Sequence, residues 1–431
     1  MAIDLAIRNV RLPHSLEPTD IGVESGLIVA IERGFVCDAP EHDAGGRLVC
    51  GGLIESHIHL DKAGIIGRCS IRAGTLAEAV TETARAKAAF TEGDVYARAS
   101  LVLEKAILNG TTRLRTFVEI DPRAGYRSFE AIKRLKAEYA DSIEIEICAF
   151  AQEGLTNEPA TEAMLETALQ SGADLVGGCP YTDPQPVEHI RRIFDLGERR
   201  QVPIDFHLDF DLDPRRSNLP EVIAQTMARG YEGRVSVGHV TSLSATTPAE
   251  LETLGKRLAK AGIAVTALPA TDLFLMGREF DSLTPRGVAP IHRLAAQGVV
   301  TTISTNNVLN PFTPFGDASL MRMANLYANI AHIGAPADLA RIFDMITVMP
   351  AKLVGKGRKG LEVGAPADLV IFDASSSSEA VAEIAPAVTG WKDGRQTFLR
   401  PPPQLLRSVR QPDGLSADTD VSLPAPPARV A

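Results

Sequence analysis

Eight short apolar runs, each separated from the next by a stretch with helical periodicity, constrain the fold of this chain more than any other feature. Helical stretches such as 76–109 and 220–229 carry apolar residues about 3.6 positions apart. Strands that alternate with helices form parallel βα units, and eight units favour closure into a (β/α)8 barrel. We therefore predict an α/β protein with a TIM-type barrel. The eight runs are 53–59, 111–120, 143–152, 174–179, 203–209, 234–239, 262–268 and 298–304.

The two ends of the chain are predicted to build a small β-sandwich beside this barrel, because both carry short alternating runs broken by Gly, Pro and acidic residues. The runs are 5–10, 21–23, 27–31, Gly360–Gly364, Asp368–Phe372 and Val388–Trp391. The predicted domains are the sandwich at 1–52 and 353–399, the barrel at 53–352, and a flexible Pro-rich tail at 400–431.

Composition narrows the class of protein. The 431 residues carry a formal net charge of −10 and show no basic stripe, which argues against a nucleic-acid partner. Five scattered cysteines without C-x-x-C spacing favour a reduced, cytoplasmic protein over a disulfide framework. No run reaches the roughly 18 apolar residues of a membrane span. We expect no membrane partner, and a homo-oligomer as for many enzymes.

Four of the nine histidines fall at the predicted carboxyl ends of strands. His57 and His59 close the first run, and residues two apart on a strand point to the same side. His207 lies near the end of the fifth run, and His239 ends the sixth. Catalytic residues of (β/α)8 enzymes gather at these strand ends, and neutral imidazole is a common ligand of zinc and iron. The arrangement therefore predicts a metal site.

The motifs around these histidines resemble those of the amidohydrolase superfamily, and within it the cytosine deaminase and N-isopropylammelide amidohydrolase branch. The resemblance covers about residues 3–395, and its motifs occur in the order of the family. The matching segments are Gly51–Lys62, Phe150–Gly154, Phe206–Asp209, Gly238–Thr241, Asn306–Gly316 and Val363–Val370.

The resemblance implies roles for several of these residues. His57, His59 and His207 would hold one divalent metal ion, with zinc expected first and iron or manganese as alternatives. His239 would polarise the substrate, and Gln152 would exchange hydrogen bonds with a heterocycle. Binuclear members use a carboxylated lysine on the fourth strand, and the run there contains no lysine, so we expect one ion.

One departure from the family pattern concerns the substrate side of the site. Cytosine deaminases carry a proton-shuttling glutamate directly after His-x-Asp, whereas this chain has Phe210 after Asp209. Phenylalanine cannot carry a proton, so Phe210 is expected to form an apolar wall of the substrate pocket. Asp209 is expected either to bind substrate or to orient a metal ligand. Lys62 is either a solvated loop charge or a contact to a substrate oxygen, as in the N-isopropylammelide type.

The second departure is Asn306, where the family keeps an aspartate as metal ligand and general base. An amide oxygen can coordinate a metal or orient a water, but it cannot take a proton at any relevant pH. Either an Asp-to-Asn substitution was introduced here, or the natural protein has lost or rerouted this chemistry. Asn307 is either a turn residue or a substrate contact, and Asp183 is either solvated or near the substrate.

The sequence thus predicts a metal-dependent hydrolase of a small nitrogen heterocycle, in which metal-bound hydroxide cleaves an exocyclic C–N bond. His239 and position 306 would be catalytic, and Asn306 would also be a metal ligand. Ring opening of a cyclic amide or imide is an alternative within the same class. A catalytically silent binding homologue is the alternative that Asn306 and Phe210 motivate.

Overall fold

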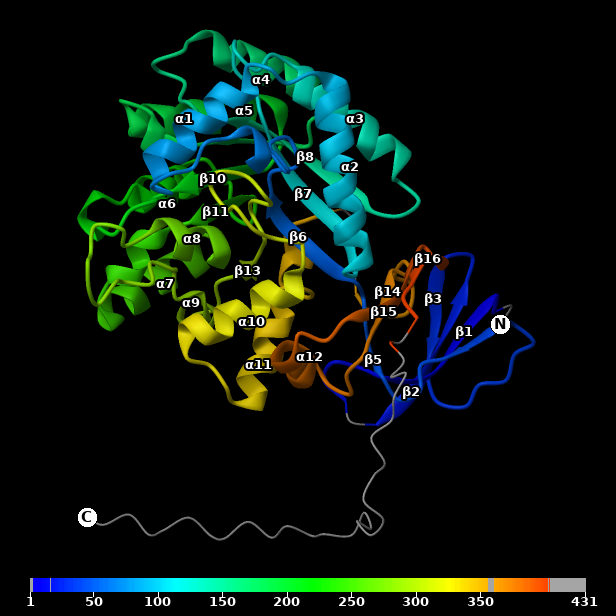
Figure 1. Ribbon diagram of the computed structural model, residues 1–431. Helices are drawn as coiled ribbons and strands as arrows, with labels where there is room; N and C mark the ends of the chain where they lie inside the picture. The colour runs from blue at the N-terminus through cyan, green and yellow to red at the C-terminus, as the bar shows by residue number, and fades with distance from the viewer. Residues whose placement is uncertain (1–2, 16, 356–359, 402, 404–431) are drawn as a thin grey trace, which may run out of the picture. The chain divides into compact units, whose positions relative to one another are not determined.

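The computed structural model of this chain describes residues 3–15, 17–355, 360–401 and 403. Its largest feature is a barrel of eight parallel strands that follow one another in chain order (Figure 1). Each of the eight predicted runs contains one of these strands, so the predicted (β/α)8 architecture is confirmed. The strands are β6 (Leu53–Ile58), β7 (Thr111–Glu119), β8 (Glu144–Ala151), β9 (Leu175–Gly178), β10 (Ile204–Leu208), β11 (Val235–His239), β12 (Ala264–Ala267) and β13 (Thr301–Ile303).

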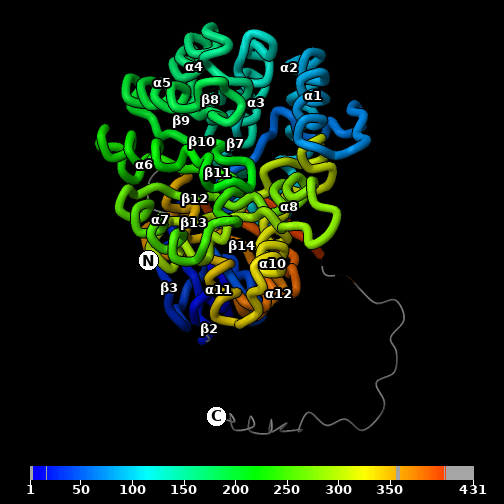
Figure 2. Tube along the Cα trace, turned by 90° about the vertical axis from the view of Figure 1, so that its left-hand side faces the viewer, coloured from blue at the N-terminus to red at the C-terminus, as the bar shows by residue number. Residues whose placement is uncertain are grey.

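Helices follow the strands and surround the barrel (Figure 2). Their starts follow local chemistry: Thr247 and Glu250 form a reciprocal capping box at the start of α7, and Pro248 occupies its first turn. The helices are α1 (Leu76–Lys87), α2 (Glu92–Leu108), α3 (Arg127–Glu138), α4 (Ala160–Gln170), α5 (Pro186–Arg200), α6 (Leu219–Ala228), α7 (Pro248–Lys260), α8 (Pro269–Leu275), α9 (Ile291–Ala295), α10 (Leu320–Ala331), α11 (Pro336–Asp344) and α12 (Ser377–Glu383).

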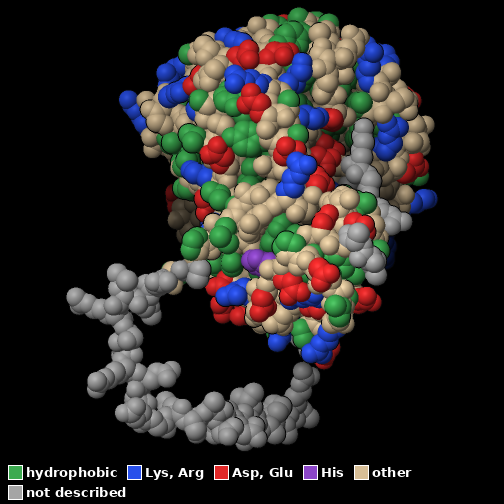
Figure 3. All heavy atoms as spheres, turned by 90° about the vertical axis from the view of Figure 1, so that its right-hand side faces the viewer, with side chains coloured by type: hydrophobic (Ala, Val, Ile, Leu, Met, Phe, Trp, Pro, Cys, Tyr) green, Lys and Arg blue, Asp and Glu red, His purple; other side chains and the backbone are tan. Residues whose placement is uncertain are grey.

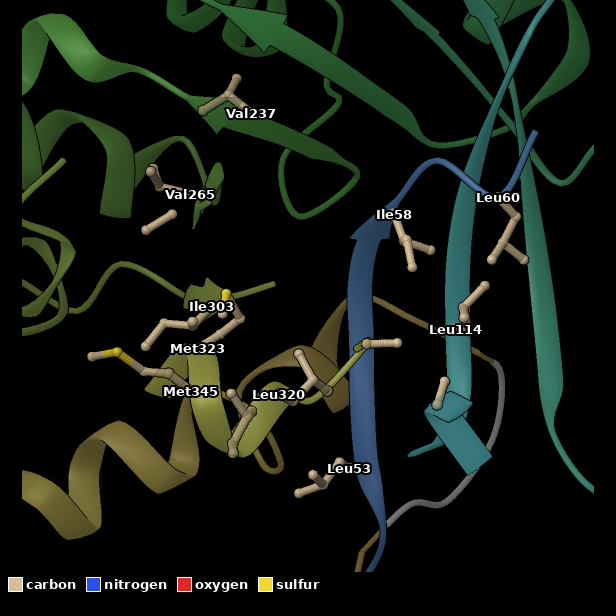
Figure 4. Packing of buried hydrophobic residues seen from close by; sticks show 14 of the residues in the cluster. Leu53, Ile58, Leu60, Leu114, Val237, Val265, Ile303, Leu320, Met323 and Met345 are labelled. Carbon is tan, nitrogen blue, oxygen red and sulfur yellow. The ribbon is translucent and has the colours of Figure 1, made fainter. Parts of the chain in front are cut away.

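The strands of the barrel are buried on both faces, as in parallel sheets covered by helices, and buried polar networks such as Arg115 with Asp205 and Ser236 accompany the apolar side chains. Strands β6 and β7 are buried along their whole length. Figure 4 shows Ile303 of β13 close to Met323 of α10 and to Met345, which follows α11. All three side chains belong to one continuous cluster of buried residues that spans the barrel and its helices.

The barrel closes between its first and last strands, at the level of the predicted metal site. The Asn306 backbone N–H donates to the His57 carbonyl at 2.9 Å, and the His59 N–H donates to the Asn306 carbonyl at 2.8 Å. The buried Glu55 carboxylate reinforces this junction because it accepts hydrogen bonds from the His57 N–H at 3.0 Å and from the Thr305 N–H and hydroxyl at 3.0 and 2.7 Å. Position 306 is thereby fixed beside the histidine pair.

Strands from both ends of the chain form a second, mixed sheet, as predicted (Figure 1). β5 pairs antiparallel with β14, which joins the two ends, and the sheet has an apolar core of its own. Its strands are β1 (Leu5–Arg11), β2 (Pro18–Glu24), β3 (Leu27–Ile31), β4 (Glu41–Asp43), β5 (Leu48–Cys50), β14 (Leu369–Phe372), β15 (Ala387–Lys392) and β16 (Arg395–Leu399).

Part of the small domain differs from expectation. Gly360–Gly364 was expected as a strand but consists of bends and turns, and its glycines at both ends adopt positive φ angles that end a strand readily. Strands β4, β5 and β16 and helix α12 were not predicted. The domain limits stay a prediction, and of the predicted tail, 402 and 404–431 lie outside the described residues.

Figure 3 shows one face of the molecule, on which basic and acidic side chains are interspersed among apolar ones. Within the described residues, no helix combines the length and apolar character that crossing a lipid bilayer requires.

Glu55 makes the stability of the metal-free protein depend on pH. Burial raises the pKa of this carboxyl from 4.5 to about 7, although its hydrogen bonds oppose the shift. Between these values the Glu55 carboxyl binds more protons in the native state than in the unfolded chain, so its contribution to the free energy of unfolding should fall as pH rises, by up to about 3 kcal/mol. The buried histidines titrate with the opposite sign in the same range, so the measurement is a difference: in urea denaturation from pH 4.5 to 7, the original chain should lose up to about 3 kcal/mol relative to Glu55→Gln.

The matched control for this experiment is Glu252→Gln, because Glu252 is exposed on α7 and pairs with Lys256 one turn along the same helix. This variant should keep the slope of the original chain. An unchanged slope in Glu55→Gln would contradict the assignment of the pH dependence to the barrel junction.

Candidate metal centre and active site

Three of the predicted metal ligands converge beneath the mouth of the barrel. His57 Nε2 lies 3.1 Å from His207 Nε2, and His59 Nε2 lies 2.8 Å from the same atom. All three side chains are buried, and one nitrogen of each lies within 4.8 Å of the others. The backbone register explains this convergence, because β6 and β10 stand across the barrel and end at the same level.

The environment keeps the three imidazoles neutral. Burial lowers the pKa of His57, His59 and His207 well below the usual value, and neighbouring imidazole and cationic groups add to the shift. Aromatic rings form the apolar floor: Phe117 lies 4.1 Å from the His57 ring and Phe150 lies 4.2 Å from the His207 ring, measured between centroids. Neutral imidazole is the form that coordinates metals.

The donor set fits a single divalent ion. Imidazole nitrogens 2.8–3.1 Å apart either share an N–H···N hydrogen bond or bind a common cation, and this spacing suits ligands on an ion with bonds of about 2.0–2.1 Å. Asn306 adds a further observation: its Oδ1 is buried and has no hydrogen-bond partner among the described residues, while its Nδ2 donates to Thr271 Oγ1 at 3.0 Å. An unpaired buried oxygen beside three imidazoles matches a metal or water ligand.

Strained backbone positions mark the ends of the strands at this site. Asp209, His239, Val240 and Asn306 have φ angles of 49°, 69°, 47° and 58°. Residues other than glycine adopt this left-handed region rarely, at a cost of order 1–3 kcal/mol each. Clustering of such residues at one end of the barrel is typical of a functional site, because surrounding contacts must hold them in place.

His239 is oriented by a carboxylate that the sequence analysis did not single out. Its Nδ1 lies 2.6 Å from Asp272 Oδ1, and both residues are buried. Because the carboxylate oxygen accepts, Nδ1 carries a proton, and Nε2 is left for the site. Asp272 is itself held by the Leu268 N–H at 3.2 Å, in the first turn of α8.

A narrow cavity of about 10 Å3 lies above the histidines. Its walls include Phe210, whose ring lies 4.5 Å from the His239 ring and stacks on Tyr181 at 5.9 Å between centroids. This volume has room for about one water molecule, so a ring can enter only when the side chains that line the cavity move apart. The lining residues are His59, Lys62, Gln152, Tyr181, His207, Phe210, His239, Thr271, Asn306, Asn307 and Phe312.

Comparison with known proteins agrees with this geometry. A sequence model of a protein family, described as the amidohydrolase family, matches residues 109–398 of this chain. The chain belongs to the amidohydrolase family. This membership confirms the prediction from sequence that the protein is a hydrolase.

Two curated relatives align over most of their length with this amidohydrolase. Pterin deaminase of Rhizobium rhizogenes is 29% identical over 372 residues, which cover 85% of this chain and 84% of that one. N-isopropylammelide isopropyl amidohydrolase of Pseudomonas sp. strain ADP is 28% identical over 408 residues, covering 91% and 96%. The crystal structure of 5-methylcytosine deaminase from Klebsiella pneumoniae with 5-fluorocytosine has a TM-score of 0.88 at 28% identity and covers 93% and 98%.

Two of the predicted substrate contacts lie elsewhere in this amidohydrolase. Asp183 accepts hydrogen bonds from the backbone N–H groups of Leu155 and Thr156 at 2.7 and 3.0 Å, and from His189 Nδ1 at 3.0 Å. Asp209 accepts from the Ser217 hydroxyl and, at 2.9 Å, from the Asn218 N–H. Neither carboxylate lines the cavity. Both order the loops behind the site.

The structure also adds residues that the sequence analysis missed. Tyr181, Thr271 and Phe312 line the cavity, and Asp272 and Glu119 hold residues that line it. The position of Glu119 at the end of the second barrel strand was a usable signal, because strand ends gather at the barrel mouth. The other four lie in loops or short helices, where sequence gives little information on side-chain direction.

Gly238 offers a test of the histidine cluster. A Cβ atom at this position would lie 2.6 Å from His57 Cε1 and 2.9 Å from His57 Nδ1, so Gly238→Ala must displace the ring. We expect the affinity for zinc to fall about 10–100-fold, as when a ligand loses its orienting contacts. Competition with a chromogenic chelator measures it.

Gly93→Ala is the matched control, because a Cβ there meets no atom within 4 Å and α2 accepts alanine well. Its affinity for zinc should equal that of the original chain. Equal affinities in all three proteins would contradict a metal site that includes His57.

Proposed function

We propose that this protein is a metal-dependent hydrolase that cleaves an exocyclic C–N bond of a small nitrogen heterocycle. The observation that carries the proposal is the convergence of His57, His59 and His207 directly beneath a cavity lined by aromatic and polar side chains. The three relatives named above are described as acting on ring compounds that bear an amino or alkylamino group, and they align with this chain almost from end to end.

The three histidines would hold one divalent ion, with zinc expected first and iron or manganese as alternatives, and Asn306 Oδ1 lies free to join them. Such an ion lowers the pKa of a coordinated water from 15.7 toward about 7 and so supplies a nucleophile at neutral pH. A cytoplasmic location and a homo-oligomeric state stay predictions.

The residues of the chain would bind and orient the ring. Tyr181 and Phe210 form aromatic walls against its faces, and Lys62 and Gln152 contact its polar edge from one side of the cavity. His239, held by Asp272, presents Nε2 to the reacting carbon, and its imidazolium form, paired with the Asp272 carboxylate, would donate from Nε2 to negative charge that develops there. The alternative expectation for Lys62, a solvated loop charge, does not hold because the residue is only 2% exposed.

Position 306 limits the rate. Asn306 cannot accept a proton, and no carboxylate is among the described residues that line the cavity. A positioned general base typically contributes 10²–10⁴-fold to a rate, so this chain should be a slow catalyst or a silent binding homologue. Ring opening of a cyclic amide remains the second candidate, because the same metal centre supports attack on a ring carbonyl.

Restoring the carboxylate tests the proposal. Asn306→Asp should raise the rate of amine release from amino- and alkylamino-substituted pyrimidines, triazines or pterins by about 10²–10⁴-fold. The assay measures free amine and ring-opened acid in parallel, together with bound metal.

Asn329→Asp is the matched control, because Asn329 lies exposed on α10, and it should leave the rate unchanged. Ring-opened acid as the product would favour the second candidate. Continued inactivity of Asn306→Asp with metal bound would favour a silent binding protein.

A further inference from the structure

A buried chain of ion pairs fixes the direction of Lys62. Its ammonium donates to Glu119 Oε1 at 2.6 Å, and both side chains are only 3% exposed. Glu119 Oε2 in turn accepts from Lys87 at 2.9 Å, and Lys87 also donates to Asp121 at 2.8 Å and to Glu153 at 2.7 Å. The Lys87 ammonium thus occupies the centre of this acidic group. Glu119 is paired on both oxygens and holds Lys62 against the cavity.

The Lys62 ammonium determines which way the Gln152 amide points. Lys62 Nζ lies 3.3 Å from Gln152 Oε1. An ammonium group can only donate, so the amide oxygen must face Lys62 and the amide nitrogen must point away from it. The only polar neighbour of that nitrogen among the described residues is Cys179 Sγ, a weak acceptor at 3.5 Å. Gln152 therefore offers N–H donors to the cavity.

Asn310 fixes Asn307 by the same logic. The Asn310 oxygen accepts from the backbone N–H groups of Phe312 at 3.0 Å and Thr313 at 3.2 Å, which cannot accept in return. The Asn310 amide nitrogen must therefore face Asn307, and it donates to Asn307 Oδ1 at 2.7 Å. With its oxygen committed, Asn307 leaves its amide nitrogen for the cavity that it lines.

We propose that Glu119 and Asn310 are positioning residues that make the polar edge of this cavity a face of donors, contributed by Lys62, Gln152 and Asn307. The ligand class that it selects is a nitrogen heterocycle with ring oxygens on the facing edge, rather than a ring with amino groups there. This inference rests on the proposed function, because it assigns the substrate of the same cavity. It replaces the expectation that Gln152 both donates and accepts.

The physical basis is the cost of burying unpaired donors. An oxo group accepts a hydrogen bond from an ammonium or amide N–H. An amino group at the same place points its own N–H at that donor, so both donors are left without an acceptor. An unsatisfied buried polar group costs about 1–3 kcal/mol, which corresponds to roughly 5–150-fold in affinity. The fixed orientations prevent a simple flip of the amides, because each flip would break contacts with Lys62 or Asn310.

The experiment compares two isosteric probes, uracil and 2,4-diaminopyrimidine, with metal-loaded protein at mildly alkaline pH, where both rings are largely uncharged. Isothermal titration calorimetry measures the ratio of their dissociation constants without any turnover. We expect uracil to bind about tenfold more tightly or more. Equal binding, tighter binding of 2,4-diaminopyrimidine, or binding of neither probe would overturn the proposal.

Two variants reverse the donor face without changing its shape. Gln152→Glu places an oxygen where the amide nitrogen points, and Asn310→Asp removes the donor that holds Asn307, so that Asn307 can rotate. Each should lower the preference for uracil about tenfold. An unchanged preference in both would overturn the proposal, because a merely structural role does not discriminate between the probes.

Glu119→Gln tests the positioning of Lys62 and should also lower the preference, with Glu138→Gln as the matched control. Glu138 pairs with Arg134 on the surface and should leave the preference unchanged. An unchanged preference in a folded Glu119→Gln protein would remove Glu119 from the proposal. Metal content and amine release report on the proposed function, whereas the preference between probes reports on the donor face, so the two failures are distinguishable.

Discussion

The pair of backbone hydrogen bonds that joins residue 306 to His57 and His59 is the constraint on which the rest of the site depends. A barrel must close, and this one closes through a last strand of only three residues, so most of the junction lies beyond that strand. The closing bridge therefore coincides with the histidine pair. Glu55 completes the junction by binding both sides of it. The same hydrogen bonds therefore close the barrel and position the site.

The barrel was predictable because its signal is repeated and local. Eight apolar runs with helical stretches between them leave few alternatives, and histidines at the ends of three runs could be placed near the axis without coordinates. The small sheet was only partly predictable. β4, β5 and β16 have only three to five residues, and β4 and β5 pair with strands far along the chain, whereas β16 pairs with its neighbour β15. Gly360–Gly364 has an apolar alternation, but its positive φ angles prevent a strand.

The site residues show the same division between those that the sequence could place and those that it could not. Those on strands, such as His57 and His207, were placed by periodicity alone. Asp209, just after β10, was not, because one backbone angle decides where its side chain points. Asp209 adopts a φ of 49°, which directs its carboxylate to the loop at Ser217 and not into the cavity. Asp272 was missed for the opposite reason: it reaches His239 from a helix of seven residues, 33 positions further along the chain.

The two departures from the family pattern, Phe210 and Asn306, change the charge of the site in the same direction. Each places a neutral side chain where members of the family branch that this sequence resembles are expected to carry a carboxylate. Three neutral imidazoles and an amide then leave the charge of a divalent ion without a carboxylate partner in the cavity. Asp272 and Glu119 reach the cavity through His239 and Lys62. Electron-rich oxygens on a ligand would supply the missing compensation, and the fixed donors of Lys62 and Gln152 favour the same atoms.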